Sequence, residues 1–164
     1  MHYFAYGSNM SVSRLRERVP SAEALGCWAL REHDLRFHKC SSDGSAKCDA
    51  YFTSDADDVI YGVLFKIDAV GKHALDKAEG LGCGYDEKEV RLTAQDGASI
   101  NATTYVATNI DENMKPYSWY VNHVLVGARQ ALLPADYIEL KITSVEAVGD
   151  GDKDRDASER AIHR

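Results

Sequence analysis

The feature that most restricts the fold is a long series of short apolar or alternating segments with few helical patterns between them. Such segments are typical of strands that bury at least one face. They are His2–Tyr6, Leu25–Leu30, Leu35–Cys40, Ala50–Thr53, Val59–Ile67, Lys88–Thr93 and Ile100–Ala107. The last two flank the stretch QDGA, and an Asp-Gly turn between two strands predicts a β-hairpin.

Helical spacing is confined to a few segments. Apolar residues recur on one face in Ala69–Glu79 and in Ser118–Leu132. A short helix is predicted over Ser11–Arg18, ending before Pro20, because proline disfavours helical geometry in the residue before it. Many strands, few helices and no strand–helix–strand rhythm predict an α+β fold. Its sheet is expected to be mainly antiparallel and able to close on itself.

The chain length and composition predict one domain followed by a tail. With 164 residues, of which 45% are hydrophobic, the chain is long enough to bury a substantial core. No linker interrupts residues 1–148, which we expect to form that domain. The following stretch GDGDKDRD is dense in charge and has no apolar side chain, so residues 149–164 are predicted to be a solvated, mobile C-terminal tail.

The charge pattern restricts the partners. The formal net charge is -7, and lysines and arginines are scattered among acids, which argues against binding nucleic acid. No segment reaches the roughly 18 to 20 apolar residues of a membrane span, and the N-terminus lacks the layout of a signal peptide. We therefore expect a cytoplasmic enzyme or binding protein that does not bind membranes, present as a monomer or homodimer.

The cysteines and histidines do not follow metal-binding spacings. Cys27, Cys40, Cys48 and Cys83 form no CxxC pair, and no HExxH motif is present. We expect the thiols to be reduced, with no structural metal and no cofactor.

The opening MHYFAYGSNM raises the first functional question, because a strand-like run stops at Gly7, Ser8 and Asn9. A strand that turns into a helix exposes unpaired N–H groups, which can bind an anion or an oxyanion. Gly7 can adopt a positive φ, and Ser8 and Asn9 can cap the helix or donate to the same ligand. The alternative is an ordinary capped turn. Ser8 lacks the GxSxG context of a nucleophile.

Glu79 is the first candidate for acid–base chemistry. It follows Leu75 by one helical turn and precedes the glycine-rich stretch Gly80–Gly84. Partial burial and the negative end of the helix dipole both favour the protonated carboxyl, which suits proton transfer near neutral pH. Two alternatives remain: Glu79 is a solvated acid, or Asp76, one turn earlier, is the reactive carboxyl.

Several segments together resemble the gamma-glutamylcyclotransferase family. The loop YGSNM, residues 6–10, is similar to the family's YGSN(L/M) motif, and LDKAEG, residues 75–80, is similar to its LDxxEG motif. Tyr85 follows the second motif. Tyr105 and Tyr120 stand where the family has aromatic residues around its pocket, with Tyr117 and Trp119 as alternatives to Tyr120. The stretch DGSAK, residues 43–47, looks like the DGSxK of some relatives. The resemblance spans about residues 1–140.

The resemblance implies a small closed β-barrel flanked by helices and an enzyme that needs no cofactor. Such an enzyme releases 5-oxoproline and an amine or amino acid from a small gamma-glutamyl substrate. Glu79 would be the catalytic acid and base. The residues implied in substrate binding are Tyr6, Gly7, Ser8, Asn9, Met10, Tyr85, Tyr105 and Tyr120. Two other functions remain open: a non-catalytic module that binds a small carboxylate, and an amide hydrolase that uses Ser8.

Overall fold

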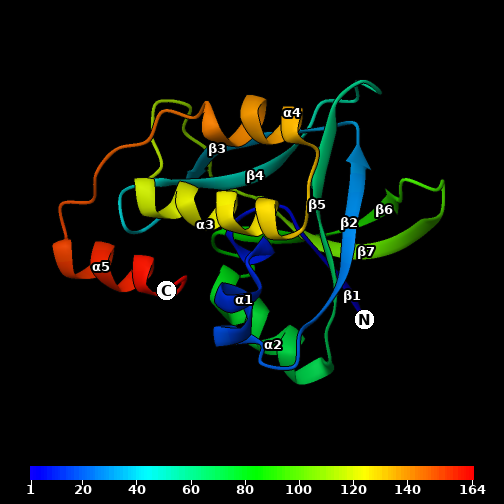
Figure 1. Cartoon of the computed structure of the whole chain (residues 1–164), viewed down its shortest axis with the longest axis horizontal. Coiled ribbons are helices and arrows are strands. Elements are labelled where there is room, and N and C mark those ends of the chain that lie inside the picture. Colours follow the sequence, from blue (N-terminus) through cyan, green and yellow to red (C-terminus); the bar gives the residue numbers. More distant parts are fainter.

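A closed β-barrel lies at the centre of the computed structural model, which describes residues 1–164 (Figure 1). The barrel order is β1-β5-β2-β6-β7. Its strands are β1 (His2–Ala5), β2 (Glu23–Arg31), β5 (Val59–Lys66), β6 (Tyr85–Thr93) and β7 (Ser99–Ala107). Neighbours are antiparallel except β1 and β7, which run parallel where Tyr3 pairs with Thr103. The predicted α+β fold with a closed, mainly antiparallel sheet is confirmed.

A second sheet and several helices surround the barrel. Strands β3 (His33–Cys40) and β4 (Ala46–Phe52) pair only with each other as a two-stranded sheet. The α-helices are α1 (Val12–Arg18), α2 (Ala69–Glu79), α3 (Ser118–Gln130), α4 (Ala135–Ile138) and α5 (Lys153–Ala161). A 3₁₀ turn, η1 (Ser8–Met10), and a π-helical turn, η2 (Glu139–Thr143), complete the chain. In Figure 1, α3 runs beside β4, and α1 lies against α2.

The predicted elements are present with shifted ends, and local chemistry explains where the helices begin and end. Helix α2 has the predicted bounds because Asp68 caps its start, accepting from the Gly71 amide at 2.7 Å, and Gly80 ends it with a φ of 63°. Helix α1 begins after Ser11, whose side chain accepts from the Arg14 amide at 3.3 Å. The expectation that Ser8 or Asn9 caps this helix is therefore wrong. Helices α4 and α5 and the turn η2 were not predicted.

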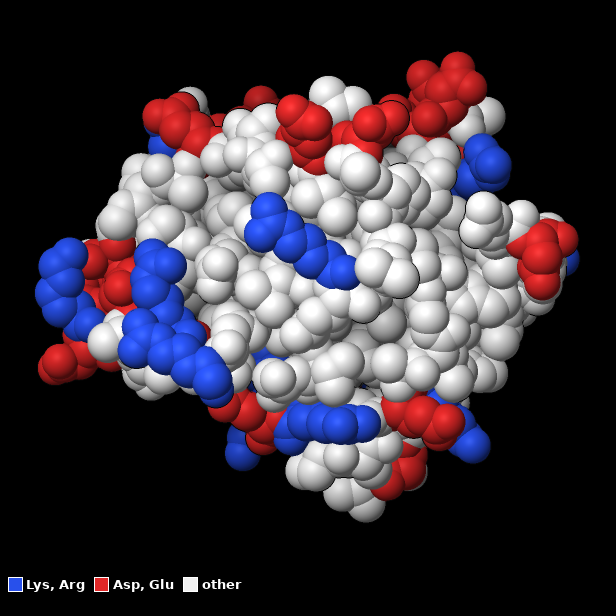
Figure 2. Space-filling view, in the orientation of Figure 1, with Lys and Arg blue, Asp and Glu red and all other residues white.

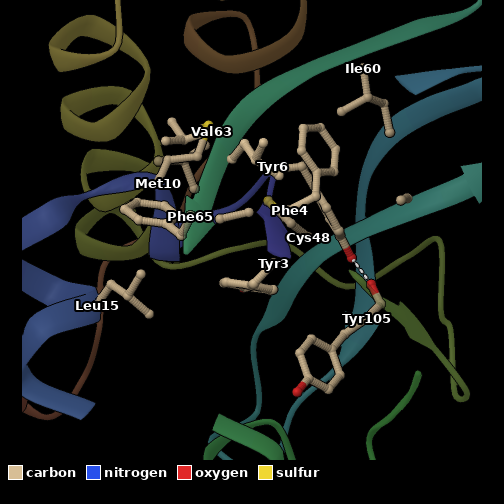
Figure 3. Packing of buried hydrophobic residues seen from close by; sticks show 14 of the residues in the cluster. Tyr3, Phe4, Tyr6, Met10, Leu15, Cys48, Ile60, Val63, Phe65 and Tyr105 are labelled. Atoms are coloured by element: carbon tan, nitrogen blue, oxygen red, sulfur yellow. Dashed lines mark hydrogen bonds between the residues drawn. The ribbon is translucent and has the colours of Figure 1, made fainter. Parts of the chain in front are cut away.

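The core joins the barrel to the helices on its outside. Phe4, Leu64 and Phe65 on β1 and β5 are almost fully enclosed, as are Leu15 on α1 and Leu75 on α2. Figure 3 shows part of this cluster around β1. Strand β1 is buried on both of its faces, which is why its sequence is a continuous apolar run instead of an alternating one.

Helix α3 packs directly onto the backbone that follows β1. A methyl group at Gly127 would lie 2.4 Å from the Ser11 nitrogen and 2.7 Å from the Met10 Cβ atom, so only glycine permits this contact. The contact fixes the position of η1 relative to α3. It therefore places the loop after β1 at a defined point on the barrel.

The charged C-terminal segment contains a helix that contacts the rest of the chain. Asp152 caps α5, and Glu159 accepts from the guanidinium of Arg14 on α1 at 2.6 Å. Arg160 donates to the Ser118 hydroxyl at the start of α3 at 2.7 Å. These contacts are polar, and no residue of α5 is buried. The spacing of apolar residues therefore does not predict this helix. It remains a prediction that residues 149–164 form a tail outside the domain of residues 1–148 and that this tail is mobile.

The helices and the charged side chains bear on the expectations about membranes and nucleic acid. No helix is long and apolar enough to cross a bilayer. In Figure 2, most acidic and basic side chains lie near the edge of the face in view, with basic side chains gathered at the left beside acidic ones and another crossing the centre. The absence of nucleic acid as a partner remains an expectation from this charge distribution.

The contact at Gly127 leads to a stability prediction. We expect Gly127→Ala to lower the free energy of unfolding by about 1–3 kcal/mol, because the new methyl group meets backbone atoms that cannot rotate away. Gly149→Ala is the matched control, since a methyl group there meets no atom within 4 Å. Urea unfolding measures both variants, and equal stability of the two would contradict the proposed packing.

Candidate active site

A cleft at the end of β1 collects nearly all the side chains that the sequence singled out. Its lining residues are Tyr3, Tyr6, Gly7, Ser8, Asn9, Cys48, Glu79, Tyr85, Tyr105 and Tyr120. Every predicted site residue is in this set except Met10, and the set adds Tyr3 and Cys48. Segments far apart in the sequence therefore meet in one place: the loop after β1, strand β4, the end of α2, and residues of β6, β7 and α3.

Met10 is a core residue, although it belongs to the predicted loop. Its side chain is buried and lies beneath Gly127 of α3, outside the cleft. Among the aromatic alternatives at the start of α3, the structure places Tyr120 in the cleft. Tyr117 instead donates to the Asp43 carbonyl at 2.9 Å, and Trp119 donates to the Asp150 carboxylate at 2.8 Å.

The loop after β1 is tight because of close packing. Gly7 has a φ of -115°, so the expected positive φ is wrong. Glycine fits here because a methyl group would lie 3.0 Å from the Cys48 Cβ atom and 3.4 Å from the Tyr120 hydroxyl. Ser8 and Asn9 begin η1, where N–H groups have no acceptor within the helix. Backbone donors therefore remain available at the edge of the cleft.

Glu79 enters the cleft from the last position of α2. Its Oε1 atom accepts a hydrogen bond from the Asn9 side-chain amide at 2.8 Å. Burial raises the pKa of the Glu79 carboxyl, and the positive charge of Arg18 and the hydrogen bond from Asn9 offset only part of that rise. The predicted direction of the shift is confirmed, and burial is its main cause.

Asp76 has the opposite electrostatic character. Burial alone would raise its pKa, but hydrogen bonds from Lys72 and from the Tyr105 hydroxyl outweigh burial and lower the pKa. The Tyr105 hydroxyl lies 2.5 Å from Asp76 Oδ1. Asp76 does not line the cleft. Of the two acids on α2, Asp76 is thus held as a charged anchor for Tyr105, whereas Glu79 can exchange a proton.

The backbone of Cys48 orients two of the tyrosines. The Tyr85 hydroxyl donates to the Cys48 carbonyl at 2.6 Å, and the Tyr120 hydroxyl accepts from the Cys48 amide at 3.0 Å. Burial raises the pKa of both phenols, so they stay neutral. Burial also raises the pKa of the Cys48 thiol to about 12, so this thiol is not a nucleophile at neutral pH.

Tyr6 closes the side of the cleft formed by β1 and β7. Its hydroxyl donates to the Tyr105 carbonyl at 2.5 Å, as the dashed line in Figure 3 shows. Burial raises the pKa of Tyr6 as well. This hydroxyl is therefore committed to a structural hydrogen bond, and Tyr6 offers mainly its ring to the cleft.

The DGSAK stretch lies behind the cleft. Lys47 donates to Asp43 Oδ2 and to the Ser45 hydroxyl, each at 2.7 Å. Its ammonium lies 4.8 Å from the centre of the Tyr120 ring, a distance at which a cation is attracted to an aromatic face. This stretch therefore supports Tyr120 from outside the cleft.

The sequence did not reveal the residues that contribute to the site through their peptide group or through a contact with another side chain. Cys48 contributes its peptide group, which no side-chain pattern reveals. Tyr3 lies in an apolar run and accepts from the Asn9 amide at 3.1 Å, a contact that only the tertiary structure creates. Arg18, the last residue of α1, donates to the side-chain oxygen Oδ1 of Asn9 at 2.8 Å. For these residues the sequence carries no local signal.

Known proteins are similar to this chain in sequence and in fold. Residues 59–140 match the AIG2-like family. The gamma-glutamylcyclotransferases of Bos taurus and Homo sapiens are 34% and 33% identical to this chain over 149 residues, covering 88% of it and 78% of each relative. A solved structure of a gamma-glutamyl cyclotransferase superposes with a TM-score of 0.86 at 26% identity, covering 98% of both chains.

The raised pKa of Glu79 predicts a pH-dependent stability difference. A carboxyl whose pKa is higher in the folded than in the unfolded protein stabilises the fold most below its unfolded pKa of about 4.3. That contribution falls as the pH rises toward the folded pKa. Glu79→Gln removes this ionisation, so we expect the variant to gain stability relative to the parent protein between about pH 4 and neutral pH. Urea unfolding across this range measures the stability of the variant relative to the parent protein. If this relative stability fell as the pH rose, the result would contradict the burial of Glu79.

Proposed function

The chain belongs to the gamma-glutamylcyclotransferase family and is an enzyme of that type. We propose that it converts a small gamma-glutamyl amide into 5-oxoproline and a free amine or amino acid. The substrate's own α-amine attacks its γ-carbonyl carbon. A ring C–N bond forms, the original amide C–N bond breaks, and the departing nitrogen gains a proton. The observation that carries this proposal is a single carboxyl of raised pKa, Glu79, inside a cleft of neutral tyrosines.

An intramolecular reaction requires few catalytic groups from the protein. Nucleophile and electrophile already belong to one molecule, so the cleft has mainly to select the folded-back conformer. Such positioning can supply several kcal/mol without a metal or cofactor. The enclosed aromatic walls from Tyr6, Tyr85 and Tyr120 suit this task, because the Cys48 backbone and the Tyr105 carbonyl hold their hydroxyls in place.

Glu79 serves as the proton carrier in this proposal. As a carboxylate it accepts a proton from the substrate ammonium, and as a carboxylic acid it returns that proton to the departing nitrogen. A group that acts first as base and then as acid works best when its pKa lies near the working pH. Burial moves the Glu79 pKa in that direction. Asp76, whose pKa is lowered, is less suited to return the proton.

The loop of residues 6–10 supplies donors for the negative groups of the substrate. The free N–H groups at Ser8 and Asn9 suit the α-carboxylate or the oxyanion that forms at the γ-carbonyl. The Tyr120 hydroxyl accepts from the Cys48 amide, and in the proposal its own proton is donated to the same group of the bound substrate.

The other two functions are less well supported. A site that only held anions would gain nothing from Glu79, since a carboxylate repels an anionic ligand. A hydrolase based on Ser8 would need a neighbouring base, and the Ser8 hydroxyl makes no hydrogen bond to a histidine: His123, on α3, contacts Arg14, Glu159 and His163 instead. The leaving group stays open, and the loops over residues 40–46 and 109–118 are candidates to select it.

The role of Glu79 can be tested by replacing each acid of α2 in turn. We expect Glu79→Gln to lower kcat by at least ~10²-fold, because the amide keeps the volume and the Asn9 contact but cannot transfer a proton. Asp76→Asn is the matched control and should retain most of the turnover. The measurement is formation of 5-oxoproline by mass spectrometry, and an inactive Asp76→Asn beside an active Glu79→Gln would move the acid–base role to Asp76.

The role of the loop can be tested at Ser8. If the backbone supplies the donors, Ser8→Ala should weaken binding of 5-oxoproline by only about 0.5–1.5 kcal/mol, the contribution of one hydrogen bond. Ser8→Pro should weaken it far more, because proline removes the N–H group. Calorimetry gives the affinities, and circular dichroism checks the fold. Loss of catalysis in Ser8→Ala with unchanged affinity would instead make the hydroxyl a reactive group.

A further inference from the structure

Arg18 is linked to Glu79 through one buried side chain. From the last turn of α1, its Nη1 atom donates to Asn9 Oδ1 at 2.8 Å. The Nδ2 atom of Asn9 donates in turn to Glu79 Oε1 at 2.8 Å and to the Tyr3 hydroxyl at 3.1 Å. Asn9 is only 4% exposed, and both ends of its amide have partners. Arg18, Asn9 and Glu79 thus form a continuous chain of hydrogen bonds.

This chain has only one possible direction. A guanidinium group can donate hydrogen bonds but cannot accept them, so the Asn9 atom that faces Arg18 must be the carbonyl oxygen. The NH₂ group of Asn9 must then face Glu79. Because an amide nitrogen can only donate, Glu79 Oε1 has to act as an acceptor whether or not the carboxyl is protonated. Arg18 therefore determines that the Glu79 oxygen facing Asn9, Oε1, accepts a hydrogen bond and does not donate one.

The other oxygen of Glu79 is left open. Oε2 has no hydrogen-bond partner in the protein. It is also not among the fully enclosed side-chain atoms without a partner, which belong to Arg14, His38, Tyr137 and His163, so Oε2 is not sealed inside the protein. Since Glu79 lines the cleft, Oε2 is the oxygen that a bound molecule can reach. When Glu79 is protonated, a proton on Oε2 can be donated to a bound molecule, whereas Oε1 faces the Asn9 NH₂ group, which cannot accept a proton.

We propose that Arg18 is a positioning residue that, through Asn9, fixes Glu79 Oε1 as a hydrogen-bond acceptor and reserves Oε2 for proton exchange with the substrate. The inference rests on the proposed cyclisation, in which Glu79 carries the proton. It adds that the proton is exchanged at one defined atom, and that a residue outside the cleft determines which atom that is.

The charge of Arg18 supports the same role. The cationic groups that act on Glu79 are Arg14 and Arg18 from α1 and Lys39 from β3, and the neighbouring phenols are those of Tyr3, Tyr6, Tyr85, Tyr105 and Tyr120. Arg14 is paired with Glu159 at 2.6 Å, and Lys39 lies over the Tyr85 ring at 4.7 Å. Only Arg18 reaches Glu79 through hydrogen bonds, and its charge opposes the effect of burial on the pKa.

The test compares Arg18→Met, which removes both donor and charge, with Arg18→Lys, which keeps both. In Arg18→Met we expect the carboxyl NMR titration of Glu79 to move to higher pH. The ascending limb of kcat/KM against pH should move in the same direction. At neutral pH, kcat/KM should fall about 10-fold, the effect of losing one hydrogen bond with a charged group. Arg18→Lys should largely restore all three quantities.

A control on the same helix separates positioning from general damage. Arg16 donates only to the Ala22 carbonyl, so Arg16→Met should leave the Glu79 titration unchanged. An unchanged titration in Arg18→Met, or a lysine variant as impaired as the methionine variant, would overturn the inference. The NMR titration needs no turnover. If the parent protein forms no 5-oxoproline, the proposed function fails while the effect of Arg18 on Glu79 is still measured.

Discussion

The seam between β1 and β7 holds the barrel closed and helps to place the candidate site. The two strands share one pair of residues, Tyr3 and Thr103, and side chains extend the contact beyond it. The Thr104 hydroxyl donates to the Phe4 carbonyl at 2.8 Å, and the Tyr6 hydroxyl donates to the Tyr105 carbonyl. This seam closes the barrel. It also brings the loop after β1 to the end of α2, so that Asn9 can contact Glu79 from a position far away in the sequence.

The two acids of α2 show how one helix can carry two different roles. Asp76 faces Lys72 and the Tyr105 hydroxyl, which stabilise its charge and make it an anchor. Glu79, one turn later, lies among phenols, and burial has a larger effect on its pKa than the nearby cations and the Asn9 amide have. An ionised carboxyl in such a place destabilises the fold. In the proposed reaction, the same environment moves its pKa toward the range in which it can accept and return a proton.

The sequence predicted what depends on local chemistry. Helix α2 begins and ends where Asp68 and Gly80 indicate, and the family motifs located Glu79 and the loop over residues 6–10. Tertiary contacts decided the rest. Gly7 is needed for close packing on Cys48 and has a negative φ, and Met10 lies under α3. The direction of the Asn9 amide depends on Arg18, and α5 is held by ion pairs that apolar spacing does not reveal.

In the proposed reaction the substrate's own amine, and not water, attacks the γ-carbonyl, and Glu79 carries the proton. Incorporation of solvent oxygen distinguishes the two nucleophiles. The enzyme is incubated with a gamma-glutamyl amino acid in water enriched in oxygen-18, and the masses of the products are measured by mass spectrometry. Intramolecular attack predicts 5-oxoproline without solvent oxygen. Glutamate that carries one solvent oxygen in its γ-carboxyl group would show hydrolysis and contradict the account.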